Sequence, residues 1–171
     1  MKKLNLLFII LLITTSATFA QKYGFVDTEY ILNNIPSYTA AQEKLDSFSE
    51  EWQNEVSEAY AAVEKMYKDY QNDAVLLSRK AKGQREEQII NMEKEARELQ
   101  ESFFGVEGEL YKKREELIQP IQDEIYNAVK EIAIEGGYAV IFDTSSGMSM
   151  LYTNPKYDVS DEVLEKLGYK N

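Results

Sequence analysis

The sequence contains neither cysteine nor histidine among its 171 residues. Disulfides, a thiol nucleophile, an imidazole base and the nitrogen or sulfur ligands of a zinc site are therefore excluded, as is a lipid anchor on cysteine. The sequence also lacks a P-loop, an EF-hand loop and a dinucleotide-binding glycine motif. We therefore expect no catalytic residue, no metal and no cofactor, and we expect that the protein is not an enzyme.

Basic residues are also in short supply, with 19 Lys and Arg against 30 Asp and Glu, for a net charge of −11. Nucleic-acid binding needs clustered Lys and Arg to displace counterions, so this balance argues against a nucleic-acid partner. It argues equally against simple electrostatic attraction to anionic lipid headgroups. A solvated acidic surface that resists aggregation is the plain explanation of the charge.

Long hydrophobic runs are absent except for Leu4–Ile13 near the N-terminus. This run follows Lys2 and Lys3 and precedes the small-residue site Thr18-Phe19-Ala20, so residues 1–20 are predicted to be a signal peptide. A membrane span needs about 20 apolar residues, and this run is shorter. We expect a periplasmic protein without stable membrane insertion. Without Lys2 and Lys3, 17 basic residues face 30 acidic ones, a net charge of −13.

Proline and glycine are scarce in the middle of the chain, where residues 38–135 contain only Pro120, Gly83, Gly105 and Gly108. Apolar residues there recur at steps of three and four, which predicts helix. The first helical face comprises Leu45, Phe48, Trp52, Val56, Ala59, Val63, Met66, Tyr70, Ala74 and Leu77. We expect Ser37 or Thr39 to cap this helix, a turn near residues 76–83, and Ser78 as the N-cap of the returning helix.

The returning helix carries a heptad seam comprising Ile89, Met92, Ala96, Leu99, Phe103, Val106 and Leu110. The seam breaks at Lys113-Arg114 and resumes through Leu117, Ile121, Ile125, Ala128 and Ile132. Gly105 and Gly108 each weaken a helix by about 1 kcal/mol, which indicates either a hinge or a close helix crossing that only glycine permits. Pro120 predicts a bend.

Short strand-like segments flank the helical region, at residues 22–27 and 138–143. A turn at residues 144–147 and a further strand at 148–153 predict a β-hairpin, and Ser160 is expected to cap a C-terminal helix. If the flanking strands pair, the helical region must leave the sheet and return. The expected fold is α+β: a β-containing oligomerisation body from residues 21–37 and 120–171, and a coiled-coil hairpin arm from residues 38–119. One chain looks short of core, so partner subunits are expected.

This order of elements resembles the Skp/OmpH family of periplasmic chaperones over residues 22–167. The likeness is most specific in Gly24-Phe25-Val26-Asp27, in Leu117-Ile118-x-x-Ile121-Gln122-x-x-Ile125-x-x-Ala128-Val129-Lys130, and in residues 158–164. The resemblance implies a homotrimer with a barrel-like body, whose helical arms enclose a cavity that holds unfolded outer-membrane proteins without ATP. The best-known members are basic, whereas this chain is acidic, so the resemblance does not extend to a lipopolysaccharide site.

Two sets of residues are candidates for these roles. The candidate client contacts are Tyr60, Tyr67, Tyr70, Phe103 and Phe104, although heptad spacing alone explains several of them, and Tyr60 and Tyr67 lie off the seam. The candidate residues of the oligomeric body are Phe25, Val26, Val140, Phe142 and Leu151.

Two other functions fit the sequence less well. A structural coiled-coil spacer or scaffold of the cell envelope is one alternative, although a spacer needs a continuous seam. A carbohydrate- or lipid-active enzyme is another, for which no constellation of site residues exists.

Overall fold

The computed structural model describes residues 21–147 and 149–170, so the predicted signal peptide lies outside the described residues. The described residues divide into two compact units, one formed by residues 21–31, 125–147 and 149–170 and the other by Leu32–Glu124. Helices α2 (Thr28–Asn33) and α5 (Glu109–Gly136) each contribute residues to both units.

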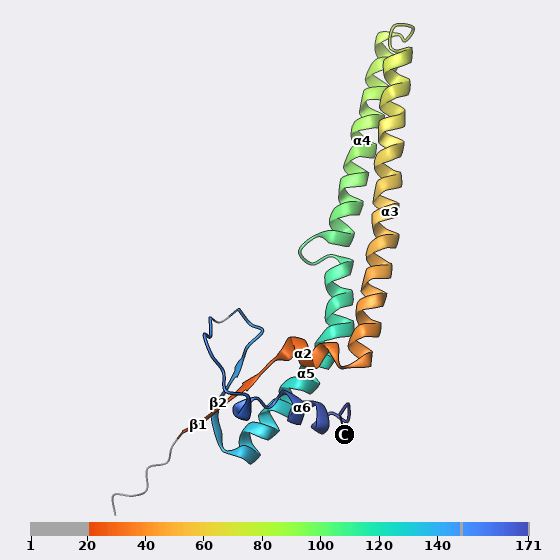
Figure 1. The fold of residues 1–171 in the computed structure, drawn as a ribbon. Coiled ribbons are helices and arrows are strands. Elements are labelled where there is room, and N and C mark those ends of the chain that lie inside the picture. The colour runs from red at the N-terminus through yellow and green to blue at the C-terminus, as the bar shows by residue number, and fades with distance from the viewer. Residues whose placement is uncertain (1–20, 148, 171) are drawn as a thin grey trace, which may run out of the picture. The chain divides into compact units, whose positions relative to one another are not determined.

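The second unit is built on a helical hairpin, in which α3 (Pro36–Asp73) and α4 (Arg79–Phe104) lie side by side (Figure 1). Ala74–Ser78 joins them, and the Ser78 hydroxyl accepts a hydrogen bond from the Ala81 N–H, which confirms the predicted N-cap. At about 1.5 Å per residue, the 38 residues of α3 extend for about 57 Å. The fold-back predicted from the sequence is confirmed.

The start of α3 differs from the prediction that Ser37 or Thr39 caps it. The helix already begins at Pro36, after the N-cap residue Ile35, whose side chain makes no capping hydrogen bond. Proline suits the first turn because its φ angle is fixed near the helical value and its missing N–H would have no partner there.

Burial along the hairpin follows the predicted seams as far as Phe103. Eight of the ten predicted seam residues of the first helix lie in α3, and the other two, Ala74 and Leu77, lie in the turn that follows it. All ten are buried or half-buried, and so are the five from Ile89 to Phe103 on α4. Leu45, Val56, Ile89 and Ala96 are the most enclosed of them, at 8% exposure or less. The apolar spacing therefore identified the contact between the two helices.

The predicted continuation of the seam through Val106 is wrong. Helix α4 ends at Phe104, residues 105–108 form a break, and α5 begins at Glu109, so Val106 is 92% exposed. The seam is interrupted at this break and not at Lys113-Arg114, which lies within α5. The paired glycines explain the difference, because each disfavours helix and together they end it.

The first unit contains a parallel pair of strands, β1 (Lys22–Val26) and β2 (Tyr138–Asp143), in which Phe25 lies opposite Phe142. Parallel strands need a long crossover connection, and here the whole helical region between them serves as that connection. Gly137, with a φ angle of 65°, ends α5 immediately before β2. Both strands were predicted, and their pairing is confirmed.

The predicted β-hairpin between residues 138–143 and 148–153 is wrong for the described residues. Residues 149–153 contain no strand, and Leu151 is fully exposed. The chain passes instead through a 3-10 turn, η1 (Pro155–Tyr157), and Asp158 forms a single bridge with Phe25. A strand needs a neighbour for its backbone hydrogen bonds, and no described strand pairs with this segment.

The C-terminal helix α6 (Ser160–Lys166) packs into the core of the first unit, where Val159, Val163 and Leu164 are at most 2% exposed. Ser160 begins this helix and is not its N-cap, which is Val159. The helix ends with two hydrogen bonds of a Schellman motif. The Gly168 N–H donates to the Glu165 carbonyl at 3.0 Å, and the Tyr169 N–H to the Leu164 carbonyl at 2.8 Å.

Candidate functional site

A groove of about 600 Å³ runs between α3 and α4, entirely within the second unit. Its apolar lining comes from both helices and consists of Tyr60, Val63, Tyr67, Tyr70, Ile89 and Ile90. Three of the five candidate client contacts, Tyr60, Tyr67 and Tyr70, are therefore brought together in one place. We call this feature the tyrosine groove.

The three tyrosines are held differently. The Tyr60 hydroxyl donates to Gln100 Oε1 at 3.0 Å, and the Tyr70 hydroxyl donates to Glu86 Oε1, so both rings are tied from α3 to α4. The hydrogen bond to the Glu86 carboxylate is the main reason why the pKa of Tyr70 is raised. Tyr67 is 49% exposed, against 37% for Tyr60. Tyr67 therefore offers the most accessible ring surface of the three.

Ile90 was not predicted as a site residue, although it is 63% exposed in the same groove. Its neighbour Ile89 belongs to the seam and is 8% exposed. Two adjacent isoleucines on a helix cannot both face one seam, because successive residues point about 100° apart. That pair in the sequence was the signal for an exposed apolar side chain beside the seam.

Three carboxylates also line the tyrosine groove: Glu64 from α3, and Glu86 and Glu93 from α4. No basic side chain is among its lining residues. Sequence reasoning assigned such glutamates to a water-facing surface and did not connect them with the tyrosines. The groove therefore combines an apolar floor with an acidic rim.

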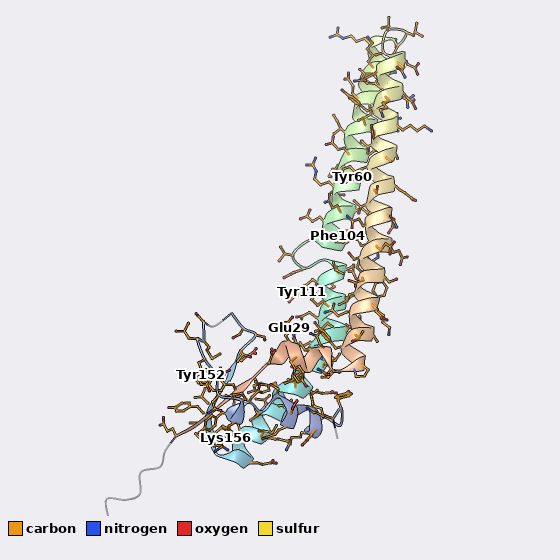
Figure 2. All side chains as sticks on the ribbon, viewed as in Figure 1. Glu29, Tyr60, Phe104, Tyr111, Tyr152 and Lys156 are labelled. Atoms are coloured by element: carbon orange, nitrogen blue, oxygen red, sulfur yellow. The ribbon has the colours of Figure 1, made fainter. Side chains whose placement is uncertain are left out.

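The other two candidate contacts, Phe103 and Phe104, lie in a separate aromatic cluster nearer the helix break. The cluster contains a stack of three rings with Trp52 in the middle. The centroid of the Trp52 ring is 5.4 Å from that of Phe48 and 5.0 Å from that of Phe103. Phe104 meets Phe103 edge-on at 6.4 Å and is 37% exposed. Figure 2 shows Phe104 beside the break and Tyr60 farther along the hairpin. Phe103 thus packs within the hairpin, and Phe104 presents part of its ring to solvent.

The candidate hinge residues Gly105 and Gly108 lie in the break between α4 and α5. A Cβ atom on Gly105 would collide with the Glu101 carbonyl oxygen, and one on Gly108 would lie 2.7 Å from the Phe103 carbonyl oxygen. Both glycines are therefore required by the close approach of the backbone to itself. A helix crossing is not the cause, because the atoms in question belong to the same turn.

The first unit carries an aromatic face on its two-stranded sheet. Tyr23, Phe25, Val140 and Phe142 share this face, since Tyr23 lies opposite Val140 and Phe25 opposite Phe142. The Phe142 ring is 6.3 Å from that of Tyr23 and 6.1 Å from that of Phe25. We call this surface the sheet face.

The five candidate residues of the oligomeric body differ in exposure. Phe25 and Phe142 are half-buried, and Val140 is 42% exposed. Val26 is 4% exposed and lies on the opposite side of β1, in the core of its own unit. Leu151 lies in the irregular segment after β2 and contacts little.

Two kinds of site are absent from the described residues. No group of three or more Asp, Glu, His or Cys side chains is placed to hold a metal ion. None of the described helices carries an apolar stretch long enough to cross a bilayer.

The sequence matches one protein family and is similar to two known proteins. Residues 22–167 match the sequence pattern of the family described as outer membrane protein (OmpH-like). The chain is 28% identical over 163 residues to the chaperone protein Skp of Vibrio cholerae serotype O1. The aligned region covers 91% of this chain and 89% of that protein. An uncharacterized protein of Aquifex aeolicus is also 28% identical, over 160 residues and 94% of each chain.

A solved structure shares the fold. The crystal structure described as an OmpH-like outer membrane chaperone from Caulobacter crescentus CB15 superposes with a TM-score of 0.66 and covers 90% of this chain and 87% of that one. At 12% sequence identity, this likeness supports the fold alone. It agrees with a small sheet carrying a long helical hairpin.

Proposed function

The chain belongs to the family of OmpH-like outer membrane proteins, and from that premise we propose that it is an ATP-independent periplasmic holdase for unfolded outer-membrane proteins. In this proposal the helical hairpin is the arm that contacts the client, and three subunits combine their sheets into one body. A signal peptide at residues 1–20 exports the chain. No cofactor and no catalytic residue takes part.

The observation that carries the proposal is the tyrosine groove. A surface apolar groove on a helical hairpin would be a liability for a chain that only needs to remain soluble. Tyr67 and Ile90 keep about half or more of their surface in solvent, at 49% and 63%. Such side chains supply apolar contact area that an unfolded chain can use wherever its own apolar residues happen to lie.

The mechanism follows from mass action. A holdase binds the unfolded chain, lowers its free concentration and so slows aggregation. Release without ATP requires many weak contacts, because a single tight pocket would retain the client. Shallow aromatic patches such as the tyrosine groove and the exposed edge of Phe104 meet that requirement. The break at Gly105 and Gly108 is where we place a hinge that adapts the arm to clients of different size.

The alternative of a structural spacer is less well supported. A spacer needs an uninterrupted helical seam to transmit length and stiffness. Here α4 ends at Phe104 and the chain leaves the helix for four residues, with Val106 turned out to solvent. An interrupted helix is therefore more suitable for a flexible arm than for a rigid spacer.

The test is suppression of aggregation. A urea-unfolded β-barrel outer-membrane protein is diluted into buffer with the mature protein at near-stoichiometric ratio, and light scattering is followed. We expect the scattering to fall strongly, and a Tyr67→Ser/Ile90→Ser variant to require several-fold more protein for the same effect.

Tyr111 provides the matched control, because it is also 49% exposed and belongs to the same unit but lies outside the tyrosine groove. Tyr111→Ser should protect the client as well as the parent protein does. Scattering that the parent protein leaves unchanged would refute the holdase proposal, and equal losses in the two variants would refute the role of the groove.

A further inference from the structure

The rim of the tyrosine groove is acidic. Glu64, Glu86 and Glu93 come from two different helices and converge on one apolar floor, without a basic residue in the lining. A neutral apolar client segment would gain nothing from these carboxylates. A cationic side chain would be attracted by all three, since opposite charges near a low-dielectric surface interact more strongly than in bulk water.

The carboxylates are available to such a cation. Glu64 pairs with Lys68 at 2.5 Å and Glu93 with Arg97 at 3.3 Å, but both are i,i+4 pairs between side chains that are more than half exposed. Exposed pairs of this kind contribute little and exchange readily. Glu86 accepts the Tyr70 hydroxyl with one oxygen, and a carboxylate can accept further hydrogen bonds.

The floor complements a cation in a second way. The ring of Tyr67 is half exposed beside Glu64, and the face of an aromatic ring attracts an ammonium or guanidinium group. Ile90 offers aliphatic surface next to Glu93 for the methylene stem of a Lys or Arg side chain. An ion with a long apolar stem therefore fits this combination better than a small one.

We infer that the tyrosine groove selects extended client segments in which a Lys or Arg lies two residues from an aromatic or aliphatic side chain. Alternate residues of an extended chain point to the same side, so both side chains can enter the groove together. This inference rests on the proposed holdase function and names the class of segment that the arm holds. It also gives the acidic arm a means of grip that does not depend on basic residues of its own.

Other occupants fit the chemistry less well. A phosphate or an anionic lipid headgroup would be repelled by three carboxylates. A second copy of the hairpin would bring the same acidic rim against this one. A cationic, partly apolar peptide is the occupant that the charges favour.

The experiment uses the full mature protein and three labelled peptides of identical length, in which each Tyr or Leu is followed two residues later by Lys, by Gln or by Glu, with Ser at the intervening positions. Binding is measured by fluorescence anisotropy at low and at physiological salt. We expect the Lys peptide to bind about tenfold more tightly than the Gln peptide at low salt and the Glu peptide to bind least, with the difference shrinking as salt is added.

Two charge-matched variants locate the effect. Glu64→Gln/Glu86→Gln/Glu93→Gln removes the rim, and Glu55→Gln/Glu58→Gln/Glu95→Gln removes the same charge from exposed positions of the same helices outside the groove. The first variant should lose most of the preference for the Lys peptide over the Gln peptide, and the second should keep that preference. Equal affinity of the parent protein for all three peptides, or equal losses in the two variants, would overturn the inference.

Aggregation suppression, measured in parallel, separates the two proposals. Protection of the unfolded client without discrimination among the peptides would overturn this inference alone. Discrimination without protection would overturn the proposed function and leave a groove specific for cationic segments.

Discussion

One hydroxyl group, that of Ser160, connects the end of β1 with the segment that begins α6. Its oxygen accepts a hydrogen bond from the Asp27 N–H at 2.8 Å and donates to Asp158 Oδ1 at 2.6 Å. Ser160 is 3% exposed and is the one polar residue among the buried side chains of the described chain. Its removal would leave the Asp27 N–H without this acceptor at the end of β1.

We expect Ser160→Ala to lower the free energy of unfolding by about 1–3 kcal/mol, the typical result of leaving a buried polar group unsatisfied. Chemical denaturation followed by circular dichroism measures this change. Ser57→Ala, on an exposed face of α3, is the control and should stay within about 0.5 kcal/mol of the parent. An unchanged midpoint for Ser160→Ala would show that the hydroxyl is dispensable.

Single residues also explain two small errors of the sequence-based prediction. Either Ser37 or Thr39 was expected to cap α3, and Ser160 to cap α6, because serine and threonine favour that position. Pro36 begins α3 earlier, and Ser160 uses its hydroxyl for Asp27, a residue 133 positions away in the sequence. Local propensity cannot reveal a partner that only the tertiary fold brings near.

At the scale of elements, the glycines of α4 and of the break act in opposite ways. Gly83 lies inside α4, and a Cβ atom there would meet nothing within 4 Å. Gly105 ends the same helix where a Cβ atom would collide with a backbone carbonyl. The same substitution should therefore have opposite signs at the two positions.

We expect Gly83→Ala to stabilise the hairpin by about 0.5–1 kcal/mol, because alanine loses less conformational freedom in a helix. Gly105→Ala should destabilise the hairpin by about 1–3 kcal/mol, because the backbone at this position cannot accommodate a side chain without strain. Thermal unfolding of the two variants measures both changes. Stabilisation by both would mean that the break is readily absorbed into a continuous helix.

The sequence predicted the elements well wherever a regular pattern extended over many turns. The seam residues from Leu45 to Leu77 and from Ile89 to Phe103 are buried or half-buried as expected, and both strands of the sheet lie where they were predicted. The pattern failed at Val106, whose spacing fits the heptad although the glycines beside it end the helix. It also failed at residues 149–153, since a strand needs neighbours that the sequence alone does not show.

The candidate site was only partly predictable for a related reason. Tyr60 and Tyr67 stood out because they are aromatic residues off the seam, and they do line the groove. The acidic rim could not be predicted, because Glu64 and Glu93 lie 29 positions apart and converge only when the register of α3 against α4 is known. Helical spacing gives the face of each helix and leaves that register open.

At the scale of the whole molecule, the chain has exposed apolar surface that assembly would cover. A sheet of two strands is marginal by itself, and the sheet face leaves Val140 42% and Tyr23 45% exposed. The chain has a net charge of −11, and −13 without the predicted signal peptide, so association must overcome electrostatic repulsion by burying apolar surface. We therefore place the subunit contact of the proposed trimer on the sheet face.

Val140→Asp tests that placement. In a separate subunit the new carboxylate would remain partly in water, so the subunit should still fold, but in a trimer it would be buried without a partner, which costs several kcal/mol. Sedimentation should show the parent protein at three times the subunit mass and Val140→Asp shifted towards the monomer, with association weakened at least tenfold. Val75→Asp makes the same chemical change at a residue that is 90% exposed in the hairpin turn, and it should leave the trimer intact. A parent protein that sediments as a stable monomer would leave the sheet face uncovered and remove the basis for a body shared by three subunits.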